Sequence, residues 1–312
     1  MKTPAIVAGP SSANLAAGVC RELAVTPIAV EAQRFPDGEL QIELRESLRG
    51  RDVFLIQTTS PPVDARVVEL VMLADACRRA GVDRLTGIVP YLGYARQDRR
   101  SGRRALGARV VADIIGTAPF DRLVLLDVHT PAIEGFFRVP IEHLTAVPLL
   151  AGAAAPFVQP DSVVIAPDLG AVKLAREYAR LLRLPLAVVY KMRTNGETVE
   201  ALNLMGDVAG RRPVVVDDML STGATIEAAA AALRAAGAIE PLVVIVSHAL
   251  IVGRAAETLR RLALARIVTS DSVERDGATG LPVTVASLAP LFAAAIRRLH
   301  RDESLSELRR PL

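Results

Sequence analysis

Short apolar runs alternate with longer amphipathic stretches along the whole chain. The apolar runs, typical of buried strands, cover residues 6–8, 53–57, 85–90 and 123–126, and then 163–166, 186–190, 214–216, 242–247, 267–269 and 283–285. Between them, apolar residues return every three or four positions, as on one face of a helix, over residues 64–80, 107–115, 171–182, 225–236 and 288–300. A further helix ends near residue 23. This alternation predicts mostly parallel sheets with right-handed helical crossovers.

The rhythm occurs twice, which predicts two domains. The chain has 312 residues, and single hydrophobic cores stop growing at roughly 250–300 residues. We expect an α/β domain over residues 1–145 and a second over residues 146–312, each with helices flanking a mostly parallel sheet. Pro140 and Pro148 lie on either side of this expected boundary. The last helix, residues 288–300, is expected to pack back on the first domain.

The composition is that of an ordinary globular protein, with 51% hydrophobic and 23% charged residues. The formal net charge is only +3, and the basic residues are spread along the chain, with one cluster at Arg96, Arg99, Arg100, Arg103 and Arg104. Proteins that bind nucleic acid have a larger basic excess with stacking aromatic residues. A small substrate rich in phosphate accounts for the cluster equally well, so we expect no nucleic-acid partner.

Nothing in the sequence predicts a membrane segment or an export signal. The longest uncharged stretch, residues 144–160, is interrupted by Pro148, Gly152 and Pro156 and is shorter than the roughly 20 apolar residues of a spanning helix. The two cysteines, Cys20 and Cys77, have no metal-binding spacing and are expected to be buried free thiols. We therefore expect a cytoplasmic protein.

The most informative stretch is residues 214–225, where an apolar strand leads into Asp217 and Asp218 and then into the turn Ser221-Thr222-Gly223-Ala224-Thr225. Backbone N–H groups and hydroxyls at the start of a helix bind anions such as phosphate. The two carboxylates cannot favour that phosphate, but they suit sugar hydroxyls or a bridging metal ion. A sugar phosphate satisfies both halves of the motif.

Three stretches of the first half carry further candidate chemistry. In the turn at residues 34–39, Phe35 can stack on an adenine ring, and Asp37 and Glu39 can accept from its amino group. In the run at residues 90–99, Arg96 and Gln97 offer donors to phosphate oxygens. The third stretch is the strand end Asp127-Val128-His129-Thr130.

Residues 214–225 resemble the phosphoribosyl-binding loop of the phosphoribosyltransferase family. With the first-half stretches, the resemblance narrows to the ribose-phosphate diphosphokinases and extends from about Val7 to Leu308. It implies two phosphoribosyltransferase-like domains and a Mg²⁺-dependent transfer of diphosphate from ATP to the C1 hydroxyl of ribose 5-phosphate. It also implies a homo-oligomer, with dimers assembled into a hexamer and ATP segments shared across a dimer interface.

The resemblance also implies the residues of each site. Lys191 and Arg193 correspond to the catalytic cations of a mobile flap, with Arg193 also near the sugar phosphate, and His129 and Asp168 correspond to Mg²⁺ contacts. The implied ATP-binding residues are Phe35, Asp37, Gly38, Glu39, Arg96, Gln97, Asp98 and Arg99. The implied ribose 5-phosphate site comprises Asp217, Asp218, Ser221, Thr222, Gly223, Ala224 and Thr225.

Two loops depart from the family pattern. Residues 102–106 read Gly-Arg-Arg-Ala-Leu in place of an Arg-Glu-Pro type of segment, and one flanking cation is absent from the basic flap, where Met192 separates Lys191 from Arg193. Two alternatives follow. One is a non-catalytic regulatory paralogue. The other is a salvage phosphoribosyltransferase, which the nucleotide motifs of the first half disfavour.

The third departure concerns regulation by phosphate. The family's site for phosphate or ADP between subunits is matched by Ser47 and Arg49, but its serine near residue 81 is Gly81 here. Because a hydroxyl donor is missing, we predict weak or absent activation in a phosphate titration of the activity. Strong activation by phosphate would contradict this prediction.

Overall fold

The computed structural model describes residues 3–100, 102–194, 199–274 and 279–308. The chain divides into two compact units, and each is described by itself. Unit 1 contains the described residues up to Thr145, together with 272–274 and 287–308. Unit 2 contains Ala146–Asp271 and residues 279–286. The last helix therefore belongs to unit 1, although it follows unit 2 in the sequence.

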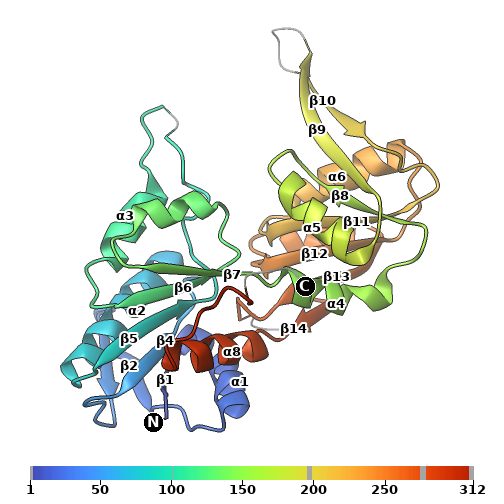
Figure 1. Cartoon of the computed structure of the whole chain (residues 1–312). Coiled ribbons are helices and arrows are strands. Elements are labelled where there is room, and N and C mark those ends of the chain that lie inside the picture. Colours follow the sequence, from blue (N-terminus) through green and yellow to red (C-terminus); the bar gives the residue numbers. More distant parts are fainter. Residues whose placement is uncertain (1–2, 101, 195–198, 275–278, 309–312) are drawn as a thin grey trace. The chain divides into compact units, whose positions relative to one another are not determined.

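Unit 1 is built on a five-stranded parallel sheet (Figure 1). In spatial order, its strands are β1 (Ala5–Ala8), β4 (Asp52–Ile56), β5 (Arg84–Val89), β6 (Arg122–Leu126) and β7 (Ile141–Leu144). Every neighbouring pair runs parallel. All five strands therefore place their carboxyl ends, and the loops that follow, at one edge of the sheet.

The helices of unit 1 cover this sheet, and α1 packs against α8. They are α1 (Ala13–Leu23), α2 (Val63–Arg79), α3 (Gly107–Ile115) and α8 (Ala289–His300), with short 3₁₀ turns at Pro10–Ser12 and Pro131–Phe136. A separate antiparallel hairpin joins β2 (Val30–Arg34) to β3 (Leu40–Leu44). The sequence analysis did not predict this hairpin: its strands are short and none of their residues is fully buried, although apolar and polar residues alternate along β3.

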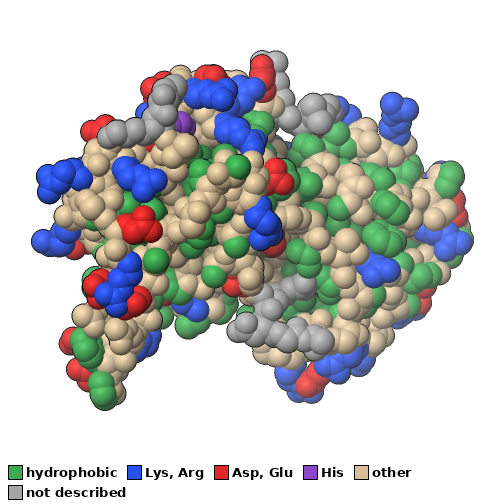
Figure 2. Space-filling view, turned by 90° about the horizontal axis from the view of Figure 1, so that it is seen from below, with side chains coloured by type: hydrophobic (Ala, Val, Ile, Leu, Met, Phe, Trp, Pro, Cys, Tyr) green, Lys and Arg blue, Asp and Glu red, His purple; other side chains and the backbone are tan. Residues whose placement is uncertain are grey.

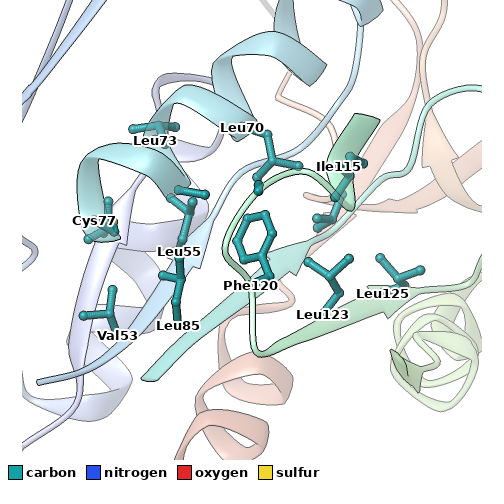
Figure 3. Close-up of a cluster of buried hydrophobic side chains, with 14 of the residues drawn as sticks. Val53, Leu55, Leu70, Leu73, Cys77, Leu85, Ile115, Phe120, Leu123 and Leu125 are labelled. Carbon is teal, nitrogen blue, oxygen red and sulfur yellow. The ribbon is translucent and has the colours of Figure 1, made fainter. Parts of the chain in front are cut away.

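The core of unit 1 lies between the sheet and the helices α2 and α3 (Figure 3). Leu70, Leu73 and Cys77 of α2 face the sheet residues Val53 and Leu85, and all five side chains are buried. Both cysteines are buried free thiols, as expected. Burial raises the pKa of the Cys77 thiol to about 12, so this cysteine serves packing rather than chemistry.

Unit 2 is built on a seven-stranded sheet. Its spatial order is β10 (Val199–Met205), β9 (Leu186–Thr194), β8 (Ser162–Ala166), β11 (Arg212–Leu220), β12 (Leu242–Ala249), β13 (Leu264–Ser270) and β14 (Val283–Ala286). Only the pairing of β9 with β10 is antiparallel; the other pairs are parallel. The helices are α4 (Val147–Ala154), α5 (Val172–Leu182), α6 (Ala224–Ala235) and α7 (Ala255–Arg260), with a 3₁₀ turn at Ala155–Phe157.

The predicted fold class, two mostly parallel sheets flanked by helices, is confirmed. The predicted strands and helices are all present, but β2, β3, β7, α4, β10 and α7 were not predicted. None of the described helices is long and apolar enough to cross a membrane. On the face in Figure 2, Lys and Arg side chains are dispersed among acidic and apolar ones and form no continuous basic band.

A network of ion pairs and hydrogen bonds links the end of α8 to the sheet of unit 1. Arg84, at the start of β5, donates to both carboxylate oxygens of Asp52, at 2.9 and 2.7 Å. It also donates to the carbonyl of Leu299 at 2.9 Å and pairs with Asp302. Nδ1 of His300 lies 2.6 Å from Asp52. Asp52 is only 13% exposed, so these partners take the place of most of the water around its carboxylate.

We predict that Arg84→Ala lowers the free energy of unfolding by about 2–4 kcal/mol, because it leaves the largely buried Asp52 carboxylate without its bidentate partner. Urea denaturation measures the change. The control is Arg79→Ala, whose guanidinium is 79% exposed and pairs with Asp75 on the same helix; its cost is expected to stay below about 0.5 kcal/mol. Equal effects of the two variants would contradict the role assigned to the network.

Candidate active site

The candidate sugar-phosphate motif lies where β11 meets α6 in unit 2. Gly223 occupies the N-cap of α6 with a positive φ of 84°, which a glycine adopts without strain. No side chain caps this helix. The first N–H groups of a helix have no partner inside it, so the start of α6 offers uncapped donors beside the hydroxyls of Ser221, Thr222 and Thr225.

The loop after β12 holds this turn in place. The N–H groups of Leu250 and Ile251 donate to the carbonyl of Leu220, at 2.9 and 3.1 Å, and the N–H of Val252 donates to the carbonyl of Ser221 at 3.1 Å. The carbonyls of Leu220 and Ser221 are thereby engaged in hydrogen bonds. The sequence analysis did not identify residues 250–252, because hydrogen bonds between backbone groups do not depend on side-chain type.

Strand β11 continues past the point at which the sequence pattern ended it. The predicted strand stopped at Val216, whereas β11 runs to Leu220, and its register pairs Asp217 with Val246 and Met219 with His248. The two aspartates therefore belong to the strand itself rather than to the turn. The end of the apolar run did not mark the end of β11, because backbone pairing with β12 continues through the charged residues.

Three carboxylates of unit 2 interact at the carboxyl ends of β8 and β11, which are neighbouring parallel strands. Burial, together with the charges of Asp218 and Asp168, raises the pKa of Asp217 to about 8. One oxygen of Asp217 accepts from the N–H of Asp218 at 2.9 Å, which opposes this shift. Asp168 accepts from the N–H of Ala171 at 3.0 Å, at the start of α5. A cation or several hydroxyl donors would relieve the repulsion.

The candidate adenine residues lie on the turn of the hairpin formed by β2 and β3. Phe35 donates its N–H to the carbonyl of Glu39 at 2.9 Å, and Gly38, with φ of 94°, donates to the carbonyl of Phe35 at 2.8 Å. Asp37 accepts from the N–H of Glu39 at 3.0 Å. The Phe35 side chain is 49% exposed, so the turn presents an aromatic face and carboxylates to solvent.

The second candidate nucleotide segment follows β5. Ala95 is buried, whereas Arg96, Gln97 and Arg99 are exposed and Asp98 is partly buried. Asp98 lies 3.8 Å from Arg99. Within the described residues, no hydrogen bond or ion pair joins this segment to the Phe35 turn. Figure 1 shows β2 near one end of unit 1 and the loop before α3 near the other.

The two candidate metal contacts belong to different units. His129 follows β6 in unit 1 and is exposed, whereas Asp168 follows β8 in unit 2 and is also exposed. Among the described residues, no group of three or more His, Cys, Asp or Glu side chains is arranged to hold a metal ion. Mg²⁺ keeps several waters and often takes only one or two carboxylates alongside substrate phosphates, so the donors present suit that mode of binding.

Lys191 and Arg193 lie on β9, beyond the point at which the predicted strand ended. Their backbones pair with Leu202 and Glu200 of β10. Their side chains lie outside the described part of the structure, so the roles assigned to them stay predictions.

The three residues compared with the family's phosphate site lie together in unit 1. The N–H of Gly50 donates to the carbonyl of Gly81 at 2.9 Å, and a Cβ on Gly81 would lie 3.5 Å from the Cα of Arg49. Gly81 has φ of 83°. A serine would have space here but would be strained by this backbone conformation.

A hollow of about 480 Å³ in unit 1 contains none of the candidate residues. It lies beside the segment that follows α8, and its charged lining comprises Arg122, Glu142, Asp302 and Glu303. Three carboxylates against one guanidinium do not suit a polyphosphate. We therefore place the candidate chemistry at the strand ends and not in this hollow.

Each unit thus has a mostly parallel sheet with candidate residues after the carboxyl ends of its strands, and unit 2 adds an acidic strand followed by an uncapped helix start. These features define the phosphoribosyltransferase type of α/β fold. A family model described as the N-terminal domain of ribose phosphate pyrophosphokinase matches residues 4–118. A second model, the phosphoribosyl transferase domain, matches residues 155–282.

Full-length relatives agree with these matches. The chain is 40% identical to a ribose-phosphate pyrophosphokinase of Rhodopirellula baltica over 99% of both chains. It is 38% identical to one of Vibrio parahaemolyticus over 97% of this chain and 98% of the relative. The crystal structure of phosphoribosylpyrophosphate synthetase from Mycobacterium smegmatis matches 96% of this chain and 100% of that one, with 34% identity and a TM-score of 0.87. The chain belongs to the ribose-phosphate pyrophosphokinase family.

The raised pKa of Asp217 predicts a pH-dependent stability. A carboxyl group whose pKa rises from 3.8 to about 8 on folding binds more protons in the folded state between these values. The free energy of unfolding therefore falls as the pH rises through that window. Because asparagine carries no charge, Asp217→Asn is expected to be more stable than the wild type at pH 8, by about 2 kcal/mol, with the difference vanishing near pH 4.

Urea denaturation in EDTA at pH 4.5, 6 and 8 measures this difference. Asp207→Asn is the control, since the Asp207 side chain is 74% exposed and is also in unit 2. If the stability difference between Asp217→Asn and wild type does not change with pH, folding does not raise the pKa of Asp217.

Proposed function

We propose that this chain catalyses the reaction of its family, the synthesis of phosphoribosyl pyrophosphate. The oxygen of the C1 hydroxyl of ribose 5-phosphate attacks the β-phosphorus of ATP. The bond between that phosphorus and the oxygen bridging to the α-phosphorus breaks, AMP leaves, and the hydroxyl proton is released. The products are the C1 diphosphate of the sugar phosphate and AMP, and no covalent enzyme intermediate is needed.

One observation carries this proposal: the chain combines a phosphoribosyltransferase domain with the N-terminal domain named for ribose phosphate pyrophosphokinase, and it aligns end to end with relatives of that name. A salvage phosphoribosyltransferase does not require the first of these domains. The relatives are named as enzymes, which supports catalysis over a purely regulatory role.

In this proposal, unit 2 binds ribose 5-phosphate. The 5-phosphate accepts hydrogen bonds from the uncapped start of α6 and from the hydroxyls of Ser221, Thr222 and Thr225. Gly223 and Ala224 complete the turn. Asp217 and Asp218 accept from the ribose hydroxyls, and the repulsion between these carboxylates is relieved as those donors arrive.

ATP binds to the exposed segments of unit 1. Phe35 stacks on the adenine, and Asp37 and Glu39, flanking Gly38, accept from its amino group. Arg96 and Gln97 donate to phosphate oxygens. Asp98 and Arg99 complete this segment.

His129 of unit 1 and Asp168 of unit 2 are each proposed as Mg²⁺ contacts, alongside substrate oxygens and water. The ion supplies charge compensation for the phosphates of ATP. The chain's own contribution to catalysis comes from Lys191 and Arg193, placed by β9 and β10. Cations directed at the transferring diphosphate stabilise the charge that develops on its equatorial oxygens.

We further propose that the working protein is a homo-oligomer, with dimers assembled into a hexamer. The Phe35 turn and the Arg96 segment do not contact each other within unit 1, so a second copy can complete the ATP site. Exposed apolar side chains on α2 (Val68 and Met72) and α3 (Val110 and Ile114) supply surface suited to self-association. The unpaired, buried thiols are consistent with the cytoplasm.

Lys191→Ala is predicted to lower kcat by about 10³-fold while the KM for each substrate changes by less than about threefold. The reason is that a cation acting on the transition state contributes little to ground-state binding. Steady-state kinetics of AMP formation measure both parameters.

The matched control is Lys173→Ala, since Lys173 is an exposed lysine of α5 in the same unit. It should leave kcat unchanged, and Lys191→Arg should recover part of the lost activity. A rise in KM equal to the fall in kcat would assign Lys191 to substrate binding instead.

A further inference from the structure

The turn at residues 91–97, here called the nucleotide turn, lies outside any helix or strand and carries Arg96 and Gln97. Its role in ATP binding is part of the proposed function, on which this inference rests. Long side chains bind phosphate well only if the backbone beneath them is held in one conformation. The contacts that hold this turn come from the segment after β4, from α2 and from α3, and none of the residues making them belongs to the predicted site.

Thr59 holds the first half of the nucleotide turn. Its hydroxyl donates to the carbonyl of Tyr91 at 3.0 Å and accepts from the N–H of Gly93 at 2.7 Å. Its own N–H donates to the same Tyr91 carbonyl at 2.9 Å. Thr59 is fully buried, so no water replaces its hydroxyl. One side chain thus joins the segment after β4 to both sides of the bend after β5.

Gly93 allows this close approach. A Cβ built on Gly93 would lie 2.4 Å from Cγ1 of Val63 and 2.9 Å from the carbonyl oxygen of Thr59. The bend is therefore pressed directly against the start of α2 and the Thr59 backbone. Glycine is required here for lack of space, since its φ is not in the left-handed region.

Tyr94 and Asp64 hold the second half of the nucleotide turn. Tyr94 has a φ of 64°, a left-handed conformation that bulky residues rarely adopt. Its phenol donates to the carboxylate of Asp64 in the first turn of α2. That carboxylate raises the pKa of Tyr94, so the phenol stays a proton donor at neutral pH.

Two further hydrogen bonds fix the backbone of Gln97, one of the residues proposed to bind the nucleotide. The N–H of Gln97 donates to the carbonyl of Tyr94 at 2.9 Å, and the carbonyl of Gln97 accepts from the N–H of Ala108 in α3 at 3.1 Å. Ala95 is buried between these fixed points, whereas Arg96 and Gln97 are exposed. The turn is thus anchored from within and directs its polar side chains outward.

We propose that Thr59 and the Tyr94–Asp64 pair are positioning residues for ATP: they fix the nucleotide turn so that Arg96 and Gln97 meet the phosphates without a prior rearrangement. These residues act through the backbone of the turn and do not touch the nucleotide. Because the support is confined to unit 1, its loss should weaken ATP binding and leave ribose 5-phosphate binding in unit 2 unchanged.

The test compares Thr59→Val with Thr59→Ser in the full-length protein. Valine keeps the shape but removes the hydroxyl, and we expect the KM for ATP to rise about tenfold, the effect of losing hydrogen bonds to buried partners. The KM for ribose 5-phosphate should stay within about twofold. Serine restores the hydroxyl and should restore the KM for ATP. Thr117→Val, which removes a hydroxyl bonded to Ile114 elsewhere in unit 1, should change neither KM.

Tyr94→Phe keeps the proposal testable if Thr59→Val fails to fold, because it removes one hydroxyl at a partly exposed position. We expect the KM for ATP to rise about threefold with an unchanged thermal midpoint. Titration with a fluorescent methylanthraniloyl derivative of ATP should show the same loss of affinity. Equal changes in both KM values, or no change in any variant, would overturn the proposal.

Arg96→Ala, measured in the same assay, separates this inference from the proposed function. If Arg96→Ala raises the KM for ATP and the Thr59 and Tyr94 variants do not, the positioning role is wrong and the site assignment stands. If Arg96→Ala leaves the KM for ATP unchanged, the segment does not bind ATP, and both the assignment and the positioning role fall.

Discussion

A parallel strand that is buried on both faces can offer side chains to a ligand only at its carboxyl end. This constraint governs both units of the chain. The middle of β11 (residues 213–216) and most of β12 are apolar and buried, so polar side chains are confined to the ends of the strands, where loops and helix starts lie. Asp168, Asp217 and the turn that follows β11 lie at that edge in unit 2, and the nucleotide turn follows β5 in unit 1.

Electrostatics at this edge are unfavourable before substrate binds. Asp217 and Asp218 are neighbours within a strand, with Asp168 close enough to contribute to the raised pKa of Asp217. Beside these negative charges stands a helix start that attracts anions and has no side-chain cap. In the proposed function, one sugar phosphate meets both conditions: its hydroxyls would donate to the carboxylates, and its phosphate would accept from the helix start.

Much of this fold could be predicted from the sequence, because buried strands and amphipathic helices have distinct periods. Short, half-exposed elements were missed. No strand residue of the hairpin carrying Phe35 is fully buried, and β11 continues through two aspartates because backbone pairing, not apolarity, decides where a strand ends. The motif at residues 214–225 was visible because strand, carboxylates and turn are contiguous.

Hydrogen bonds between residues far apart in the sequence could not be predicted from it. Thr59 and Tyr91 are hydrogen-bonded but lie 32 residues apart in the sequence. The hydrogen bonds from residues 250–252 to Leu220 and Ser221 use only backbone atoms. The same limit applies to the proposed ATP site, whose two segments are far apart in the sequence and share no hydrogen bond or ion pair among the described residues of unit 1. Resemblance to a family, rather than periodicity, brought those segments together as a single site.

The most direct measurement of the central claim is phosphorus NMR of the products formed from ATP, Mg²⁺ and purified protein, with and without ribose 5-phosphate. The account predicts that AMP and a sugar diphosphate appear together, in equal amounts, only when the sugar phosphate is present. ADP in place of AMP would mean transfer of a single phosphoryl group. AMP release that does not depend on ribose 5-phosphate would mean that the sugar is not the acceptor, and either result would contradict the proposed reaction.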